Sequence, residues 1–182
     1  MHQAALQLRL STRRDVPAIR DLIAASAREL SVGYYTPEQV EVALQGTFGV
    51  DSQLIEDQTY WLIQAADRIV AAAGWSFRAT LYGADGAASR VPDLLDPARD
   101  AARIRAFFVA PDMARRGLAT QLLARCEREA VIVGFARTTL MATLPGVDFY
   151  RARGYVGDQF VTLPMTDAVS LSLLPMHKAL TH

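Results

Sequence analysis

The chain has 182 residues, 51% hydrophobic and 21% charged, and its nineteen Lys and Arg residues balance nineteen Asp and Glu residues. This length predicts one domain with a substantial core, and this composition excludes intrinsic disorder. The zero net charge argues against nucleic acid and anionic membranes as partners, because both select for positive charge. One cysteine and three scattered histidines predict neither an internal disulfide nor a metal site. With no signal peptide or membrane-spanning run, we expect a cytoplasmic protein.

The N-terminal part of the chain predicts one strand followed by two helices. Apolar and polar residues alternate over 6–10, which is the period of a half-buried strand. Apolar residues then recur at helical spacing over 16–30. Thr36 is the expected N-cap of a second helix, because Pro37 suits the first helical position and Gln39 completes a capping box.

The middle of the chain predicts a hairpin and then an insertion. Two apolar runs, 59–65 and 69–77, are separated by three residues, a length that suits a β-hairpin. Residues 78–103 form a long polar connection, and loops of this length inside compact domains usually carry function. The connection either covers the site, forms a subunit contact or lies exposed to solvent. A further strand over 104–111 is ended by proline.

The C-terminal part predicts alternating helices and strands. A long helix spans about 116–133, with apolar residues at i, i+4 spacing, and a strand follows over 138–143. A short helix over 147–153 comes next, and two closing strands complete the chain, the second over 170–180. No repeat or composition shift divides the sequence, so a single domain over 1–182 is expected.

The segment 107–120, FFVAPDMARRGLAT, predicts an anion site. A strand ends at Pro111, a short loop follows, and a helix begins near Gly117. Unpaired N–H groups and the helix dipole at such a helix start attract phosphate. Gly117 and Ala119 let a phosphate approach the backbone, and Arg115 and Arg116 add charge. The absence of GK[ST] and of further glycines excludes a Walker loop and a GxGxxG fingerprint. Taken alone, the pattern also fits a helix with two solvated arginines.

This segment resembles the coenzyme A-binding motif of the GNAT superfamily of N-acetyltransferases. That motif is usually written Q/R-x-x-G-x-G/A, after a strand that ends in V-x-P. Val109, Pro111, Gly117 and Ala119 are in register with it. Ala114 stands where the family has Gln or Arg, which removes one phosphate-facing side chain but leaves the backbone cradle intact.

A second motif of the same family lies about thirty residues further on. The family commonly has a strand, an Asn-centred bend and a helix that reads FYxxxGF or FYxxxGY. Here Phe149 and Tyr150 are followed by Gly154 and Tyr155 at the matching spacing. Thr143 stands where the Asn is usual. Both motifs in this order and spacing make the resemblance specific.

The resemblance covers about residues 6–178 and implies an α/β fold of the mixed α+β kind. Its sheet is strongly curved, with about seven strands and about four flanking helices, and residues 78–103 are an insertion in it. The strands over 104–109 and 138–143 are expected to splay apart at one end. Acyl-CoA would lie in the gap between them.

The resemblance also implies contacts with acetyl-CoA as cosubstrate, and no metal. The pantetheine arm would pair with the main chain of 107–109, as an added strand does. The pyrophosphate would meet N–H groups of 115–120. The implied contact residues are Phe107, Phe108, Val109, Arg115, Arg116, Gly117, Leu118, Ala119, Thr120, Thr143, Phe149 and Arg153.

The implied reaction is direct attack of an amine on the thioester carbonyl. Tyr150 occupies the usual general-acid position for the departing sulfur, although its ring could instead only pack under the cosubstrate. The N–H of Val109 is the implied oxyanion donor. Many relatives carry a glutamate base on the strand 104–109, where Arg105 is here the only titratable residue. Candidate bases elsewhere are Glu29, Asp148, His177, Tyr34 and Tyr35.

The sequence contains few features that indicate the acceptor. We expect a small-molecule primary amine, with Tyr34, Tyr35 and Trp75 in its pocket; Trp75 could equally pack in the core. A protein N-terminus or lysine is the alternative acceptor. A non-catalytic acyl-CoA sensor or interaction domain, and a nucleotide-phosphate binder, are alternative functions. A homodimer is expected from the habit of the family.

Overall fold

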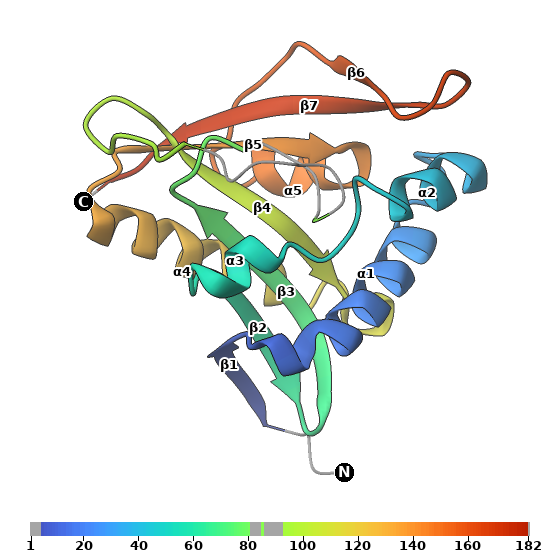
Figure 1. Cartoon of the computed structure of the whole chain (residues 1–182), viewed down its shortest axis with the longest axis horizontal. Coiled ribbons are helices and arrows are strands. Elements are labelled where there is room, and N and C mark those ends of the chain that lie inside the picture. The colour runs from blue at the N-terminus through green and yellow to red at the C-terminus, as the bar shows by residue number, and fades with distance from the viewer. Residues whose placement is uncertain (1–4, 81–84, 86–92, 182) are drawn as a thin grey trace.

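The computed structural model describes residues 5–80, 85 and 93–181, and it is built around one seven-stranded sheet (Figure 1). The strand order is β1-β2-β3-β4-β5-β7-β6, and every pair is antiparallel except the central pair of β4 and β5. The predicted mixed sheet of about seven strands is confirmed. The strands are β1 (Leu6–Leu10), β2 (Tyr60–Ala65), β3 (Arg68–Ser76), β4 (Ala102–Val109), β5 (Arg137–Thr143), β6 (Val161–Pro164) and β7 (Ser170–Ala179).

Five α-helices and three short 3₁₀ turns connect the described strands. The α-helices are α1 (Val16–Leu30), α2 (Pro37–Leu44), α3 (Ser52–Glu56), α4 (Leu118–Val133) and α5 (Val147–Arg151). The 3₁₀ turns are η1 (Arg13–Asp15), η2 (Pro111–Met113) and η3 (Leu144–Gly146). Sequence analysis expected about four helices and did not predict α3. Five residues are too short to show helical periodicity, although the Asp51 side chain caps α3 by accepting the Leu54 N–H.

The helix boundaries follow from local chemistry. The Thr36 hydroxyl accepts the Gln39 N–H, and the Gln39 side chain accepts the Thr36 N–H, so the predicted capping box starts α2. Gly134 ends α4 in the left-handed region at a φ of 107°, a conformation that is costly for residues with a Cβ. Most described elements therefore begin and end within a few residues of their predicted limits.

The centre of the sheet is covered on both faces. Strand β3 is buried at every residue from Ile69 to Ser76, because α1 and α4 both pack on it. Figure 1 shows these two helices, in blue and gold, flanking β3 and β4. Strand β6 lies at one edge of the sheet and is largely exposed. The core therefore holds β3 and β4 in place, and β4 carries residues that line the cavity described below.

The two parallel strands separate after a short contact. Strands β4 and β5 pair only at Ala102 with Thr138 and at Arg103 with Thr139. Further along β4, Ala106 adopts a φ of 54°, and the pairing of β4 with β3 shifts register at a bulge. A bulge bends its strand and increases the local twist. The splay that the family resemblance implied is thus present, and it opens a gap in the middle of the sheet.

The connection predicted over 78–103 is shorter than the sequence indicated, because its two ends are joined by backbone hydrogen bonds and β4 begins before residue 103. The Ala79 N–H bonds to the Asp93 carbonyl over 3.0 Å, and the Leu95 N–H bonds to the Phe77 carbonyl over 2.8 Å. Strand β4 already begins at Ala102. Residues 81–84 and 86–92 lie outside the described part of the chain, so the role expected for the insertion stays a prediction. In the described part, no helix is both long and apolar enough to cross a membrane.

Candidate active site

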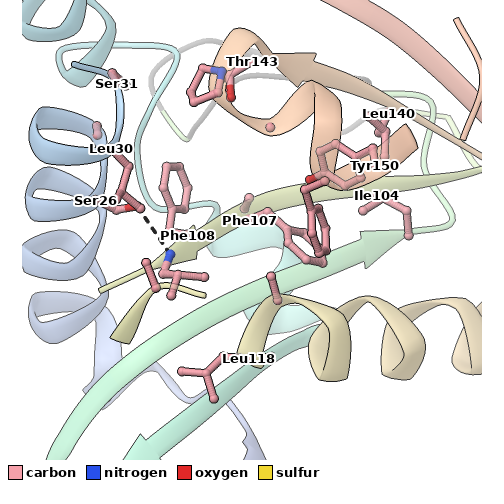
Figure 2. A pocket seen from close by; sticks show the side chains of 18 of the residues that line it. Ser26, Leu30, Ser31, Ile104, Phe107, Phe108, Leu118, Leu140, Thr143 and Tyr150 are labelled. Carbon is pink, nitrogen blue, oxygen red and sulfur yellow. Dashed lines mark hydrogen bonds between the residues drawn. The ribbon is translucent and has the colours of Figure 1, made fainter. Parts of the chain in front are cut away.

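A cavity of about 760 Å³ occupies the gap between β4 and β5. Its walls come from α1, from β4, from the start of α4 and from α5. Figure 2 shows Ser26 and Leu30 on α1 and Ser31 at its C-terminal end, with Leu140 and Tyr150 on the other side of the cavity. The cavity brings together most of the predicted site residues: Tyr34, Phe107, Phe108, Val109, Arg115, Gly117, Leu118, Ala119, Thr120, Thr143, Phe149, Tyr150 and Arg153.

The start of α4 forms a cradle at one end of this cavity. Gly117 is the N-cap at a φ of 81°, and Arg115 is also left-handed at 65°. No acidic residue lies in the first turn of α4, so the positive end of its dipole is not neutralised. A Cβ built on Gly117 would meet no atom within 4 Å, which means that the space beside its backbone is open. These features suit an anion, as a pyrophosphate would require.

Arg153 lies beside this cradle. Its Nη2 donates to the Thr120 hydroxyl over 2.7 Å, and its guanidinium carbon lies 5.2 Å from the centre of the Phe149 ring. Its Nε is buried and makes no hydrogen bond with any described residue. A guanidinium has five N–H donors. Arg153 therefore keeps donor capacity for a ligand in the cavity.

Tyr150 sits in a cluster of aromatic rings. Its ring centre lies 6.0 Å from that of Phe107, 5.1 Å from that of Phe149 and 5.6 Å from that of Tyr155. The side chain is 8% exposed, and its hydroxyl makes no hydrogen bond with any described residue. Burial raises the pKa of the Tyr150 hydroxyl well above its usual value. Tyr150 is therefore held as a neutral phenol with an uncommitted donor.

The main chain of β4 presents an N–H group to the gap. The Ala110 N–H bonds to the carbonyl of Val70 in β3, over 2.8 Å. Because successive N–H groups of a strand point to opposite sides, the N–H group of Val109 faces away from β3, toward the gap. The Val109 N–H donates to the Ser26 hydroxyl over 3.3 Å, the contact drawn in Figure 2.

Comparison with known proteins identifies the family and the fold. The model of the Acetyltransferase (GNAT) family matches residues 20–155, more than half of the chain. The protein belongs to the GNAT acetyltransferase family. Among solved structures, it is similar to a GCN5-related N-acetyltransferase from Rhodopseudomonas palustris, with 22% identity, 99% of each chain covered and a TM-score of 0.72. No curated protein gives a significant match.

Two further solved structures share the GNAT fold. One is the PaiA N-acetyltransferase of Thermoplasma acidophilum in complex with coenzyme A, with 13% identity, 96% of this chain and 99% of that chain covered and a TM-score of 0.67. The other is Ard1 from Thermoplasma volcanium, with 15% identity, 98% and 99% covered and a TM-score of 0.63. As a GNAT member, the protein is an acyl-CoA-dependent N-acetyltransferase with acetyl-CoA as cosubstrate.

The GNAT cavity excludes three of the residues predicted from the sequence. Trp75 does not line it; it packs against Phe77 and Phe135 in the core, which was its alternative role. Tyr35 is also outside, because its hydroxyl donates to the Ser172 carbonyl over 2.7 Å and accepts the Leu144 N–H over 3.0 Å. Arg116 is exposed and does not line the cavity.

Most candidate bases are also remote from the cavity. Glu29 and His177 are exposed and do not line it, whereas Tyr34 does and is 51% exposed. Every Asp and Glu of the chain lies in the described part, and Asp148 is the only one that lines the cavity. The Asp148 side chain is 93% exposed. The described lining of this GNAT cavity thus contains no buried carboxylate.

Arg105 forms part of the lining of the cavity, and its charge is paired with that of the buried Asp51 carboxylate. Its Nη2 lies 2.7 Å from Oδ2 of Asp51, and both side chains are 7% exposed. Burial raises the pKa of Asp51, and the Arg105 charge opposes that rise. In the sequence, Arg105 stood out only as a residue that cannot act as a base, and its pairing with Asp51 was not predicted. A contact across 54 positions leaves no periodic signal in the sequence.

Several other lining residues were missed. Ser26, Ala27 and Leu30 come from one face of α1, and Ser31 caps its C-terminal end. The helical periodicity of α1 predicted that this face would be buried, but it did not show that part of the face borders a cavity. In the described residues, no group of three or more His, Cys, Asp or Glu side chains is placed to hold a metal.

Proposed function

We propose that this acetyltransferase transfers the acetyl group of acetyl-CoA to the primary amine of a small molecule. The proposal rests on one observation. A single cavity joins the α4 cradle to a wall of small and aromatic side chains, which includes Ser31, Tyr34 and Phe48. In structure, the chain also resembles N-acetylglutamate synthase from Neisseria gonorrhoeae complexed with coenzyme A and L-arginine, at 18% identity over 34% of that chain and a TM-score of 0.56.

The cradle and β4 hold the cosubstrate in this proposal. The pyrophosphate binds the N–H groups of the first turn of α4, with Arg115 and Arg153 supplying charge. The main chain of β4 around Phe107 pairs with the pantetheine arm, and the Val109 N–H is left for the thioester carbonyl. The side chains of Thr143 and Phe149 line the same path. The contacts are mainly to the backbone, which explains how a chain without net charge holds an anionic cosubstrate.

The chemical step uses few side chains. The amine lone pair attacks the thioester carbon, negative charge develops on the carbonyl oxygen, and the Val109 N–H stabilises that charge. The C–S bond then breaks, and Tyr150 donates its proton to the departing sulfur. The amine loses one proton overall, and that proton restores the Tyr150 hydroxyl through solvent. Because no buried carboxylate lines the cavity, the amine enters the reaction in its neutral form.

Binding calorimetry with acetyl-CoA, coenzyme A and ATP, followed by a thiol-release screen over small amines, tests this function. Acetyl-CoA binding with amine-dependent thiol release supports it. Binding of acetyl-CoA with release only in the presence of peptides would instead assign a protein N-terminus or lysine as acceptor. Binding without release from either class would leave an acyl-CoA sensor, and preferential ATP binding would indicate a nucleotide-phosphate binder.

A further inference from the structure

Ser26 occupies an unusual position on the wall of the cavity. It lies in α1, is 6% exposed and borders the cavity, where its hydroxyl accepts the Val109 N–H over 3.3 Å. That is the only hydrogen bond of the Ser26 side chain among the described residues. Figure 2 shows Ser26 reaching from α1 to the main chain of β4.

Among the described residues, no group accepts the hydroxyl hydrogen of Ser26. A serine hydroxyl is one donor as well as an acceptor, and inside a helix it commonly donates to the carbonyl four residues earlier. No such bond to the Leu22 carbonyl is present. A buried donor without a partner costs free energy, and a ligand that supplies an acceptor recovers that cost. The unused donor of Ser26 therefore favours a ligand acceptor at this point of the cavity.

The Ser26 hydroxyl and the Val109 N–H are close enough to bind the same acceptor atom. The two donor atoms are 3.3 Å apart, so one oxygen can lie about 2.9 Å from both without movement of the backbone. Strand β4 is held by the core, and α1 packs directly on β4. The two donors are therefore fixed relative to each other before any ligand binds, as a preorganised site requires.

We propose that the Ser26 hydroxyl and the Val109 N–H together bind one carbonyl oxygen of acetyl-CoA. The inference rests on the proposed function, because it needs acetyl-CoA in this cavity. The hydroxyl turns its hydrogen toward that oxygen, and the Val109 N–H is shared between the Ser26 oxygen and the ligand oxygen in a three-centre hydrogen bond. Ser26 keeps its proton throughout, and no bond to it forms or breaks.

Two carbonyl groups of the cosubstrate have the required chemistry. If the oxygen is that of the thioester, Ser26 supplies a second donor where negative charge develops, and its loss slows the reaction. If the oxygen belongs to a pantetheine amide, Ser26 positions the arm and acts on binding alone. Coenzyme A carries the amides but not the thioester, so it separates the two.

The experiment compares the full-length wild type with Ser26→Ala, Ser26→Thr and the control Ser31→Ala. Ser31 is 5% exposed and borders the same cavity, but its side chain makes no hydrogen bond to β4 among the described residues. Infrared difference spectra follow acetyl-CoA labelled with ¹³C at the thioester carbonyl, and calorimetry measures Kd for acetyl-CoA and coenzyme A. Neither measurement needs an acceptor. Alanine favours helix, so Ser26→Ala should fold, as circular dichroism will check.

With a thioester contact, Ser26→Ala raises the labelled carbonyl frequency and weakens acetyl-CoA about three- to tenfold, while the Kd of coenzyme A stays constant. With an amide contact, both ligands weaken by that factor and the frequency stays constant. Ser26→Thr keeps the wild-type values in either case, as does the thioester frequency in Ser31→Ala.

The proposal is overturned if Ser26→Ala changes neither the frequency nor either Kd. It is also overturned if Ser26→Thr loses as much as Ser26→Ala, because the hydroxyl would then not be responsible. If the wild type binds coenzyme A and acetyl-CoA but Ser26→Ala changes neither the frequency nor the Kd values, the proposed function still stands. A wild type that binds neither ligand removes the proposed function itself.

Discussion

The guanidinium of Arg153 donates a hydrogen bond to the Thr120 hydroxyl, with 2.7 Å between Nη2 and Oγ1. Thr120 belongs to the first turn of α4, and Arg153 lies two residues beyond the end of α5. The contact therefore joins the phosphate cradle to the segment that carries Tyr150. A ligand held by the cradle is thereby placed at a defined distance from the proposed proton donor.

Arg153→Met should weaken acetyl-CoA binding by about tenfold, since a hydrogen bond to a charged group contributes about 1.5–3 kcal/mol and solvent screens part of it. The salt dependence of Kd should also become flatter. Calorimetry at several salt concentrations measures both effects. Arg151→Met is the matched control, because Arg151 is half exposed and does not line the cavity. Equal losses in the two variants would contradict a specific role for Arg153.

Gly117→Glu should abolish acetyl-CoA binding, and Gly117→Ala should largely preserve it. Both variants place a Cβ at a φ of 81°, which costs about 1–2 kcal/mol of stability, and neither Cβ meets an atom within 4 Å. Only glutamate adds negative charge where the pyrophosphate would bind. Thermal melts should therefore show similar losses of stability, whereas calorimetry separates the variants. Retained affinity in Gly117→Glu would remove the cradle from the proposed function.

Tyr150→Phe should lower kcat by about 100-fold, the usual size of a general-acid contribution, and leave the Kd of acetyl-CoA within about twofold. Burial raises the pKa of this phenol, so the proton donor stays protonated as pH rises. We therefore expect kcat/KM for an alkylamine to rise with pH, as its neutral fraction grows, without an alkaline decline at pH 9 to 10. Unchanged kcat would leave Tyr150 a packing role, and an alkaline decline would mean that the proton donor titrates in this pH range and is not the buried Tyr150.

Arg105→Met should destabilise the fold by about 3–5 kcal/mol, because it leaves the buried Asp51 carboxylate without its cation. Adding Asp51→Asn should recover much of this loss, since the amide carries no charge and can still cap α3. Denaturant unfolding measures both variants. An equal loss in the double variant would mean that packing, and not charge, explains the effect.

The pH dependence of Arg105→Met follows from the burial of Asp51. Burial raises the folded-state pKa of Asp51, and the variant removes the positive charge that opposes the rise. A group with a raised folded pKa favours the folded state below its unfolded pKa and loses that contribution as pH rises through the folded value. The deficit of Arg105→Met should therefore grow from acidic to neutral pH.

Most of the secondary-structure elements could be predicted from the sequence alone. Alternation, helical periodicity, the Thr36 capping box and the glycines that end helices are local properties, and local sterics and hydrogen bonds decide them. The two spaced motifs around Gly117 and Tyr150 added the family, and the residues of both motifs do border one cavity. Local signals failed for α3, because one helical turn and a half is too short to be periodic.

Only the tertiary structure decided which side chains face the cavity. Trp75 and Phe108 are both aromatic residues on central strands, yet Trp75 packs in the core and Phe108 borders the cavity. The difference arises because the bulge at Ala106 and the splay of β4 from β5 determine where the gap opens. Tyr34 and Tyr35 are adjacent in sequence, and only Tyr34 lines the cavity. The Asp51–Arg105 and Ser26–Val109 contacts join distant segments, whose approach depends on how the whole core packs and not on any local pattern.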